Sequence, residues 1–74
     1  MTSEQAMRLA LAEAERARDA GEVPVGAVVI CEERVVGVGF NQPISAVDPT
    51  AHAEVVALRA AARTLGNYRL TGSQ

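Results

Sequence analysis

The chain has 74 residues and a formal net charge of −2 at pH 7, so it is at most one small domain without the basic balance typical of nucleic-acid binders. Its one cysteine, Cys31, excludes an internal disulfide, its first residues form no basic and then apolar leader, and no apolar run approaches the roughly 20 residues that span a bilayer. We therefore expect a cytoplasmic protein with no membrane segment and, because only Phe40 and Tyr68 are aromatic, a thin core.

The first predicted element is an amphipathic helix over residues 2–20. Thr2, with Gln5 three residues later, has the pattern of a capping box, and Gly21 is suited to end the helix. The apolar positions at helical spacing are Met7, Ala10, Leu11, Ala14 and Ala17. We expect the charged face of this helix to lie in solvent.

Two strands are predicted to follow. Residues 25–31 are a continuous, largely β-branched apolar run, which is typical of a strand buried on both faces and central in its sheet. Residues 32–34 form a turn, and residues 35–40 return as the second strand of an antiparallel hairpin. In this second strand, Gly37 and Gly39 indicate backbone that another part of the protein approaches closely.

After a loop over residues 41–47, a second helix is predicted to begin with Asp48 as its N-cap residue and Pro49 in its first position. Gly66 and Asn67 end it, and residues 68–70 lead toward a further strand. The residues expected on its buried face are Val55, Leu58, Ala62 and Leu65. The order α-β-β-α leaves the first strand with one neighbour, so the architecture is expected to be incomplete.

The segment from Asp48 to Glu54 contains the only histidine of the chain. His52 offers an imidazole that can bind a metal such as zinc, and Glu54 offers a carboxylate that can carry a proton. Residues two apart on a helix lie roughly 200° apart around its axis, so the two converge on one ligand only at the helix tip. Taken alone, such a histidine is more often an ordinary surface or core residue, and Glu54 could merely complement the helix dipole.

Four segments of the chain carry a resemblance to a known family: residues 22–28, 39–41, 48–54 and 67–70. In their order and spacing they resemble the N-terminal half of the bacterial tRNA-specific adenosine deaminases, in the zinc-dependent cytidine deaminase superfamily. The resemblance implies an α/β fold, the cytidine deaminase-like α-β-α sandwich, truncated here to α-β-β-α. Residues 1–74 would then be the N-terminal part of a single, incomplete deaminase domain.

By that resemblance His52 is the first zinc ligand, Glu54 is the catalytic proton shuttle and Asn41 contacts a flipped-out adenosine. The family's Pro-Cys-x-x-Cys segment, expected beyond Gln74, would supply the two further cysteine ligands of the zinc ion. The implied function of the complete zinc enzyme is hydrolytic deamination of adenosine to inosine at the wobble position in the tRNA anticodon loop. The complete enzyme is expected to be a homodimer, and the 74-residue chain alone is expected to be inactive.

Other interpretations stay open from the residues alone. Residues 48–54 also resemble guanine and cytidine-type deaminases, although residues 23–25 and 67–70 favour the tRNA enzymes. The chain could also be a metal-free binding module or a non-functional truncation product. The coding sequence after Gln74 separates these, because a Pro-Cys-x-x-Cys in frame, or in a neighbouring frame after a slip, supports a deaminase fragment or a truncation product.

Overall fold

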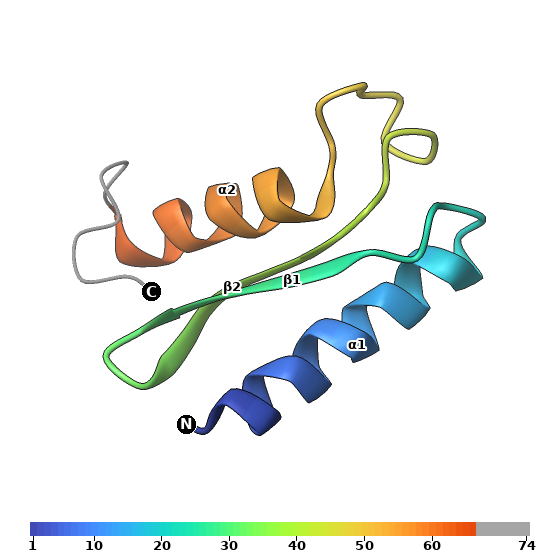
Figure 1. Ribbon diagram of the computed structural model, residues 1–74. Helices are drawn as coiled ribbons and strands as arrows, with labels where there is room; N and C mark the ends of the chain where they lie inside the picture. Colours follow the sequence, from blue (N-terminus) through green and yellow to red (C-terminus); the bar gives the residue numbers. More distant parts are fainter. Residues whose placement is uncertain (67–74) are drawn as a thin grey trace.

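The computed structural model describes residues 1–66, which form two helices and two strands. Their order is α1 (Ser3–Asp19), β1 (Gly26–Cys31), β2 (Arg34–Phe40) and α2 (Ala53–Leu65). The strands pair as an antiparallel hairpin, and the two helices lie along opposite faces of it, which gives the predicted layers of α, β and α (Figure 1). None of the described helices is long and apolar enough to cross a membrane. The strand predicted at residues 68–70 lies outside the described part of the chain.

Local hydrogen bonds begin and end α1 as the sequence predicts. The Thr2 hydroxyl oxygen accepts a hydrogen bond from the backbone N–H of Gln5 at 3.1 Å, and the Gln5 side-chain oxygen accepts one from the backbone N–H of Thr2 at 2.8 Å. These two bonds make the capping box. At the other end, Gly21 has a φ of +76°, the left-handed conformation that favours glycine after a helix.

The apolar face predicted for α1 is only partly correct. Ala17 is fully buried, but the side chains of Met7 and Leu11 are exposed. The helix lies close to β1 at Gly26, where an added Cβ would collide with the backbone of Ala10 and Ala14. The contact therefore follows the small residues of α1, and the longer side chains of Met7 and Leu11 stay exposed.

The hairpin turns through only two residues. Glu32 and Glu33 have φ values of 50° and 68°, as in a type I′ turn, whose twist matches the twist of paired strands. Arg34, predicted in the turn, therefore opens β2 opposite Cys31. The register is interrupted by an irregularity after Val29. Among the described residues β1 pairs only with β2, so its second edge has no strand beside it there.

The two glycines of β2 bring α2 close to the hairpin, as predicted. A Cβ on Gly39 would lie 2.5 Å from the Ala53 carbonyl oxygen and 2.6 Å from the Ala57 nitrogen, and one on Gly37 would also collide with the α2 backbone. The fully buried residues of α2 are Ala53, Ala57 and Ala61. The predicted buried face is therefore only partly correct: half-buried Leu65 packs against the core, whereas Leu58 is 46% exposed and Val55 and Ala62 are half-buried. At this separation the interface admits methyl groups and excludes larger side chains.

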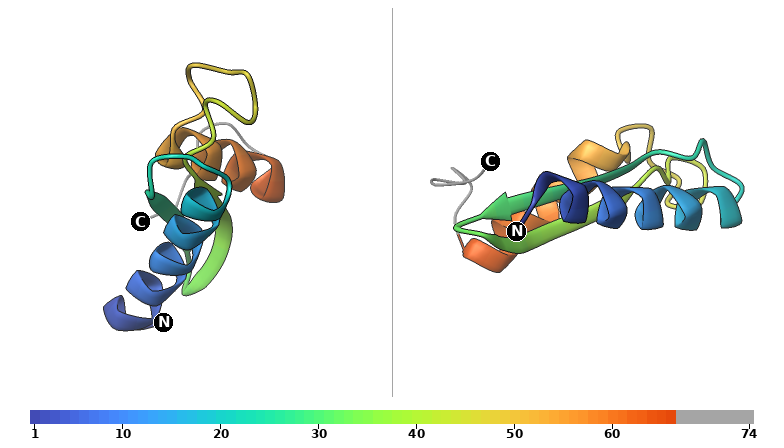
Figure 2. Two further views of the ribbon diagram at one scale, coloured as in Figure 1. Left: turned by 90° about the vertical axis from the view of Figure 1, so that its right-hand side faces the viewer. Right: turned by 60° about the horizontal axis from the view of Figure 1, so that its bottom comes forward.

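The core is as thin as the composition indicates. Its buried apolar residues are Ala17, Val29, Cys31, Val36, Ala51, Ala53, Ala57 and Ala61. No large side chain is fully buried in the described part of the chain. The views in Figure 2 show both helices running lengthwise beside the hairpin, with the loop before α2 projecting from one end. The candidate site lies at that end.

Candidate active site

The helix that carries the candidate catalytic residue begins later than predicted. α2 starts at Ala53 with His52 as its N-cap residue, instead of Asp48. Asp48 closes a local turn, in which its Oδ1 accepts hydrogen bonds from the Thr50 backbone N–H at 2.9 Å and from the Thr50 hydroxyl at 2.7 Å. These bonds occupy the acceptor that the sequence analysis assigned to the helix, and they form because Asp and Thr readily bond to neighbouring backbone.

A residue from another element caps α2. The Oδ1 atom of Asn41, the residue after β2, accepts a hydrogen bond from the Ala53 backbone N–H at 3.0 Å. The side chain of His52 makes no capping bond itself. Because a backbone N–H can only donate, this contact directs Oδ1 toward the helix and Nδ2 away from it. The end of β2 is thereby tied to the first turn of α2.

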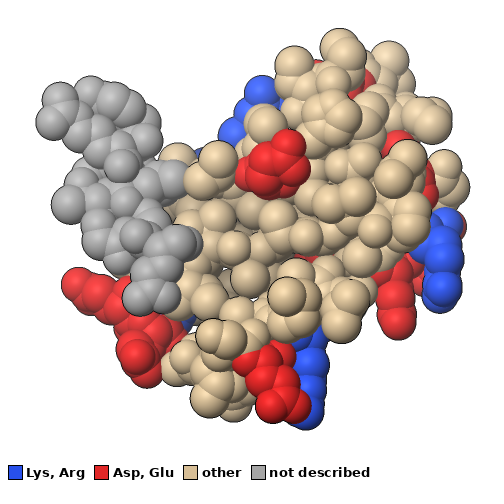
Figure 3. All heavy atoms as spheres, in the orientation of Figure 1, with Lys and Arg blue, Asp and Glu red and all other residues tan. Residues whose placement is uncertain are grey.

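The structure brings the three candidate residues to one end of the molecule. Asn41 is buried at the end of β2, exposed His52 precedes α2 in an extended conformation, and exposed Glu54 lies in the first turn. The expectation that His52 and Glu54 lie at a helix tip is thus met, at a tip that begins four residues later than predicted. Acidic atoms are visible over this turn in Figure 3, whereas the surface over the hairpin beside it is uncharged.

Glu22, which was not predicted as a site residue, holds the loop between Asn41 and His52. Its carboxylate accepts hydrogen bonds from the backbone N–H groups of Ile44 at 3.2 Å and Ser45 at 2.7 Å. Burial raises the pKa of the Glu22 carboxyl, but the bonds from Ser45 and Ile44 outweigh it and lower the pKa below the ordinary value of 4.5. The only sequence signal for Glu22 is its place in the family-like segment at residues 22–28.

Arg59 of α2, which was not predicted as a site residue either, holds the other side of the same loop. Its guanidinium lies 3.4 Å from Asp48 Oδ2 and 3.3 Å from the Thr50 hydroxyl oxygen. The hydrogen bonds from Thr50, and then the Arg59 side chain, lower the pKa of Asp48 below its ordinary value of 3.8. The ion pair is largely exposed, so its net contribution to stability is small.

His52 fits one position of a zinc site but cannot form one alone. A catalytic zinc ion takes about three protein ligands, and residues 1–66 contain no cluster of three or more His, Cys, Asp and Glu side chains able to hold a metal ion. Cys31 is buried in the core cluster with Val29 and Val36, as expected for a small apolar residue. Residues 1–66 by themselves therefore do not complete a three-ligand zinc site.

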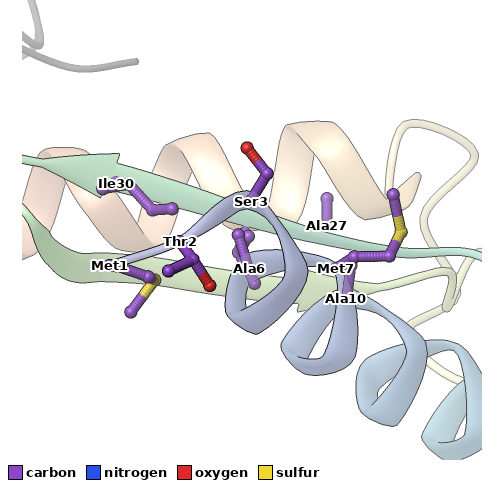
Figure 4. Close-up of a pocket in the computed structure, with 9 residues that line it drawn as sticks. Met1, Thr2, Ser3, Ala6, Met7, Ala10, Ala27 and Ile30 are labelled. Carbon is purple, nitrogen blue, oxygen red and sulfur yellow. The ribbon is translucent and has the colours of Figure 1, made fainter.

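A separate hollow of about 440 Å³ lies between the N-terminal half of α1 and β1 (Figure 4). The residues that line it are Met1, Thr2, Ser3, Ala6, Met7, Ala10, Ala27, Val28 and Ile30. None of the three candidate residues contributes to it, and it holds no acidic, basic or imidazole side chain. It is an apolar surface beside β1 and offers no chemistry of its own.

Comparisons with known proteins place the chain in one family. The family described as the cytidine and deoxycytidylate deaminase zinc-binding region matches residues 1–74, and the chain belongs to this family. A tRNA-specific adenosine deaminase of Haemophilus influenzae is 49% identical over 71 residues, which cover 95% of this chain and 41% of that protein. The predicted family resemblance is thus confirmed.

Two solved structures confirm the fold. A chain from studies of A-to-I editing by tRNA:A34 deaminases superimposes with a TM-score of 0.90 at 41% identity, over 95% of this chain and 51% of that one. A guanine deaminase of Bacillus subtilis superimposes with a TM-score of 0.85 at 38% identity, over 92% of this chain and 44% of that one. The chain spans about half the length of these relatives or less.

Proposed function

We propose that residues 1–74 are the N-terminal part of a single zinc-dependent deaminase domain, and that the complete enzyme hydrolyses adenosine to inosine at the wobble position of tRNA. The observation that carries this proposal is the joint placement of Asn41, His52 and Glu54 where β2 ends and α2 begins. The similarity to a tRNA-specific adenosine deaminase supports the tRNA anticodon loop as the substrate. A cytoplasmic location is supported by the single cysteine, and a homodimer by the family resemblance.

In this proposal Glu54 moves protons. Hydrolysis replaces the 6-amino group of adenosine with an oxygen from water and releases ammonia, so protons must pass from the water to N1 of the ring and to the leaving nitrogen. The exposed Glu54 carboxylate in the first turn of α2 accepts and returns these protons. A zinc ion, when bound, supplies the Lewis acidity that lowers the pKa of water. His52 provides one of its ligands, and two cysteines from the second half of the domain provide the others.

Asn41 is proposed to contact the flipped-out adenosine through its amide nitrogen. Its Oδ1 is occupied by the Ala53 N–H, and no hydrogen bond from Nδ2 is present within residues 1–66. The asparagine side chain is nevertheless buried, so its orientation is set before a substrate arrives. Two N–H donors are thus held in place beside the helix tip, where they can bind an acceptor on the nucleoside.

The second half of the domain is proposed to pack beside β1. Helices cover both faces of this strand, and strands covered in this way usually have neighbours on both edges. Within residues 1–66 only β2 lies beside it. Away from its acidic turn at residues 32–33, the surface over the hairpin in Figure 3 is uncharged, as expected of a surface that another part of the domain covers.

Deamination of guanine is the second candidate function. The observation that favours it is the TM-score of 0.85 to the guanine deaminase of Bacillus subtilis. The two candidates differ in substrate, since one acts on a nucleoside within tRNA and the other on a free base. A non-catalytic truncated module is the remaining alternative, and it predicts no turnover of either substrate.

The test uses a complete deaminase in which this chain is joined to the second half of the Haemophilus influenzae relative, hereafter the chimera. We expect it to form inosine in a tRNA anticodon stem-loop that carries adenosine at the wobble position, as measured by nucleoside analysis. Deamination of guanine instead would favour the second candidate. Absence of both activities in a folded, zinc-loaded chimera would support the non-catalytic module.

The roles of the two residues at the helix tip can be separated in the chimera. Glu54→Gln should reduce turnover by several orders of magnitude while zinc stays bound, because the amide keeps the shape and loses the proton transfer. His52→Ala should lose zinc as well. Glu15→Gln, at an exposed position on α1, is the control and should change neither. Loss of zinc from the Glu54→Gln protein would show that the two roles are assigned wrongly.

A further inference from the structure

The loop between Asn41 and His52 holds an unfavourable backbone conformation. A hydrogen bond from the Gln42 N–H to the Ala51 carbonyl oxygen, at 2.9 Å, closes it at its base. Within the loop, Val47 has a φ of +51° and an 89% exposed side chain. β-branched residues avoid this left-handed region, so contacts elsewhere must stabilise the loop.

The buried Glu22 carboxylate provides such a contact from a distant part of the chain. Its Oε1 accepts the Ile44 N–H at 3.2 Å, and its Oε2 accepts the Ser45 N–H at 2.7 Å. The residue is 7% exposed, so water cannot readily replace it as the acceptor for these two groups. Both carboxylate oxygens are used, and both bonds end on consecutive peptide units of the same loop.

Glu22 is itself held in place by the end of α1. Its backbone N–H donates to the Ala17 carbonyl oxygen at 2.9 Å, and the Gly21 N–H donates to the Arg18 carbonyl oxygen at 3.0 Å. With Gly21 in the left-handed conformation, these bonds form a Schellman motif. Ala17 is fully buried against the hairpin, so the loop is connected to the core through a short series of fixed contacts.

We propose that Glu22 is a positioning residue of the deamination site, which acts by holding the loop between Asn41 and His52 through Ile44 and Ser45. This inference rests on the proposed function. Without the carboxylate, the residues at the helix tip stay in place, but the loop must become ordered each time a substrate binds. The free energy needed to order the loop then weakens substrate binding, so KM should rise by a larger factor than the one by which kcat falls.

The experiment compares Glu22→Gln with the parent chimera. The glutamine side chain keeps one acceptor oxygen, but its NH₂ group would face a backbone N–H of the loop, and two donors cannot form a hydrogen bond. Hydrogen exchange at the backbone N–H groups of Ile44 and Ser45 should therefore accelerate at least tenfold. For the tRNA stem-loop we expect KM to rise about tenfold, with kcat within threefold of the parent and zinc fully bound. The matched control is Glu13→Gln, a carboxylate of similar burial that pairs with Arg16 on α1 and does not contact the loop. It should change neither exchange at the two amides nor KM.

Two results would overturn the proposal: unchanged exchange at Ile44 and Ser45, or accelerated exchange with an unchanged KM. Should Glu22→Gln fail to fold, Glu22→Asp takes its place, because it keeps the carboxylate but shortens the side chain by one methylene group, so the carboxylate no longer reaches the N–H groups of both Ile44 and Ser45. It should raise KM two- to threefold, and an unchanged KM would count against the proposal. If the parent chimera formed no inosine, the proposed function would be refuted. Hydrogen exchange at Ile44 and Ser45 would still decide whether Glu22 holds the loop.

Discussion

Replacing Gly39 with alanine should both destabilise the protein and displace the start of α2. The added Cβ would lie 2.5 Å from the Ala53 carbonyl oxygen, 2.6 Å from the Ala57 nitrogen and 2.9 Å from the Val56 Cβ. Two of these atoms belong to helix backbone, which cannot rotate away as a side chain can. The first turn of α2 must therefore retreat from β2 by about 0.5–1 Å to restore normal contact distances of roughly 3.5 Å.

The size of the effect follows from that displacement. Overpacking of this kind costs about 1–3 kcal/mol, partly offset by the ~0.5–1 kcal/mol that alanine recovers over glycine within a strand. We expect a net loss of about 1 kcal/mol in the free energy of unfolding. The shift also carries Ala53 away from Asn41 and moves Glu54 with it. In an active site, a displacement of about 1 Å can cost ~100-fold in rate.

The assay is thermal or urea unfolding of the chimera, together with inosine formation per folded molecule. Gly66→Ala is the control, since Gly66 has a φ of +66° at the other end of α2 and, apart from its own chain neighbours, nothing in residues 1–66 lies within 4 Å of its added Cβ. That substitution should cost ~1–2 kcal/mol through backbone strain alone and leave turnover per folded molecule unchanged. The reasoning is refuted if Gly39→Ala retains parental stability and turnover, or if Gly66→Ala reduces turnover as strongly.

Three further outcomes are expected. Thr2→Ala removes the capping box of α1 and should lower the free energy of unfolding of the chimera by about 1 kcal/mol in urea titrations, with no change in turnover. The folded-state pKa of Asp48 lies below its ordinary value of 3.8, so the stabilisation by Thr50 and Arg59 is fully present above that pH and is lost as the pH falls below it. In Asp48→Asn the free energy of unfolding should therefore depend less on pH in this acidic range. An unchanged slope of the free energy of unfolding against pH would contradict the assignment. Residues 1–74 alone should neither deaminate the tRNA stem-loop nor bind one zinc ion per chain, because His52 is one ligand where about three are needed. One zinc ion per chain by metal analysis would contradict this prediction.

Features that depend on neighbouring residues could be predicted from the sequence. The capping box of Thr2 and Gln5 and the stop at Gly21 each involve residues within one turn of the helix, so the sequence contains all the groups that form them. The close approach of a helix to Gly37 and Gly39 was also predictable, because a missing side chain in a strand leaves room for backbone. The helix-start residues Asp48 and Pro49 likewise predicted that His52 and Glu54 lie at a helix tip, although α2 begins four residues later.

Tertiary contacts decided where that tip lies and which face of α2 is buried. Asp48 has the local preference for a helix cap, but it bonds to Thr50, and Asn41 caps the helix from 12 positions away. The pattern of large apolar residues favoured Leu58 for the core, yet the close approach to β2 admits only alanines there. In both cases the deciding partner comes from another element, whose distance and orientation the local pattern does not contain.

Glu22 shows the same limit for the candidate site. In the sequence it is one acidic residue in a turn after a helix, and turns are rich in such residues. Its partners are the backbone N–H groups of Ile44 and Ser45, which every non-proline residue also possesses and which therefore leave no signal in the sequence. Only the folded chain brings the end of α1 against the loop before α2, and only there does a buried carboxylate become an anchor for the loop beside the site.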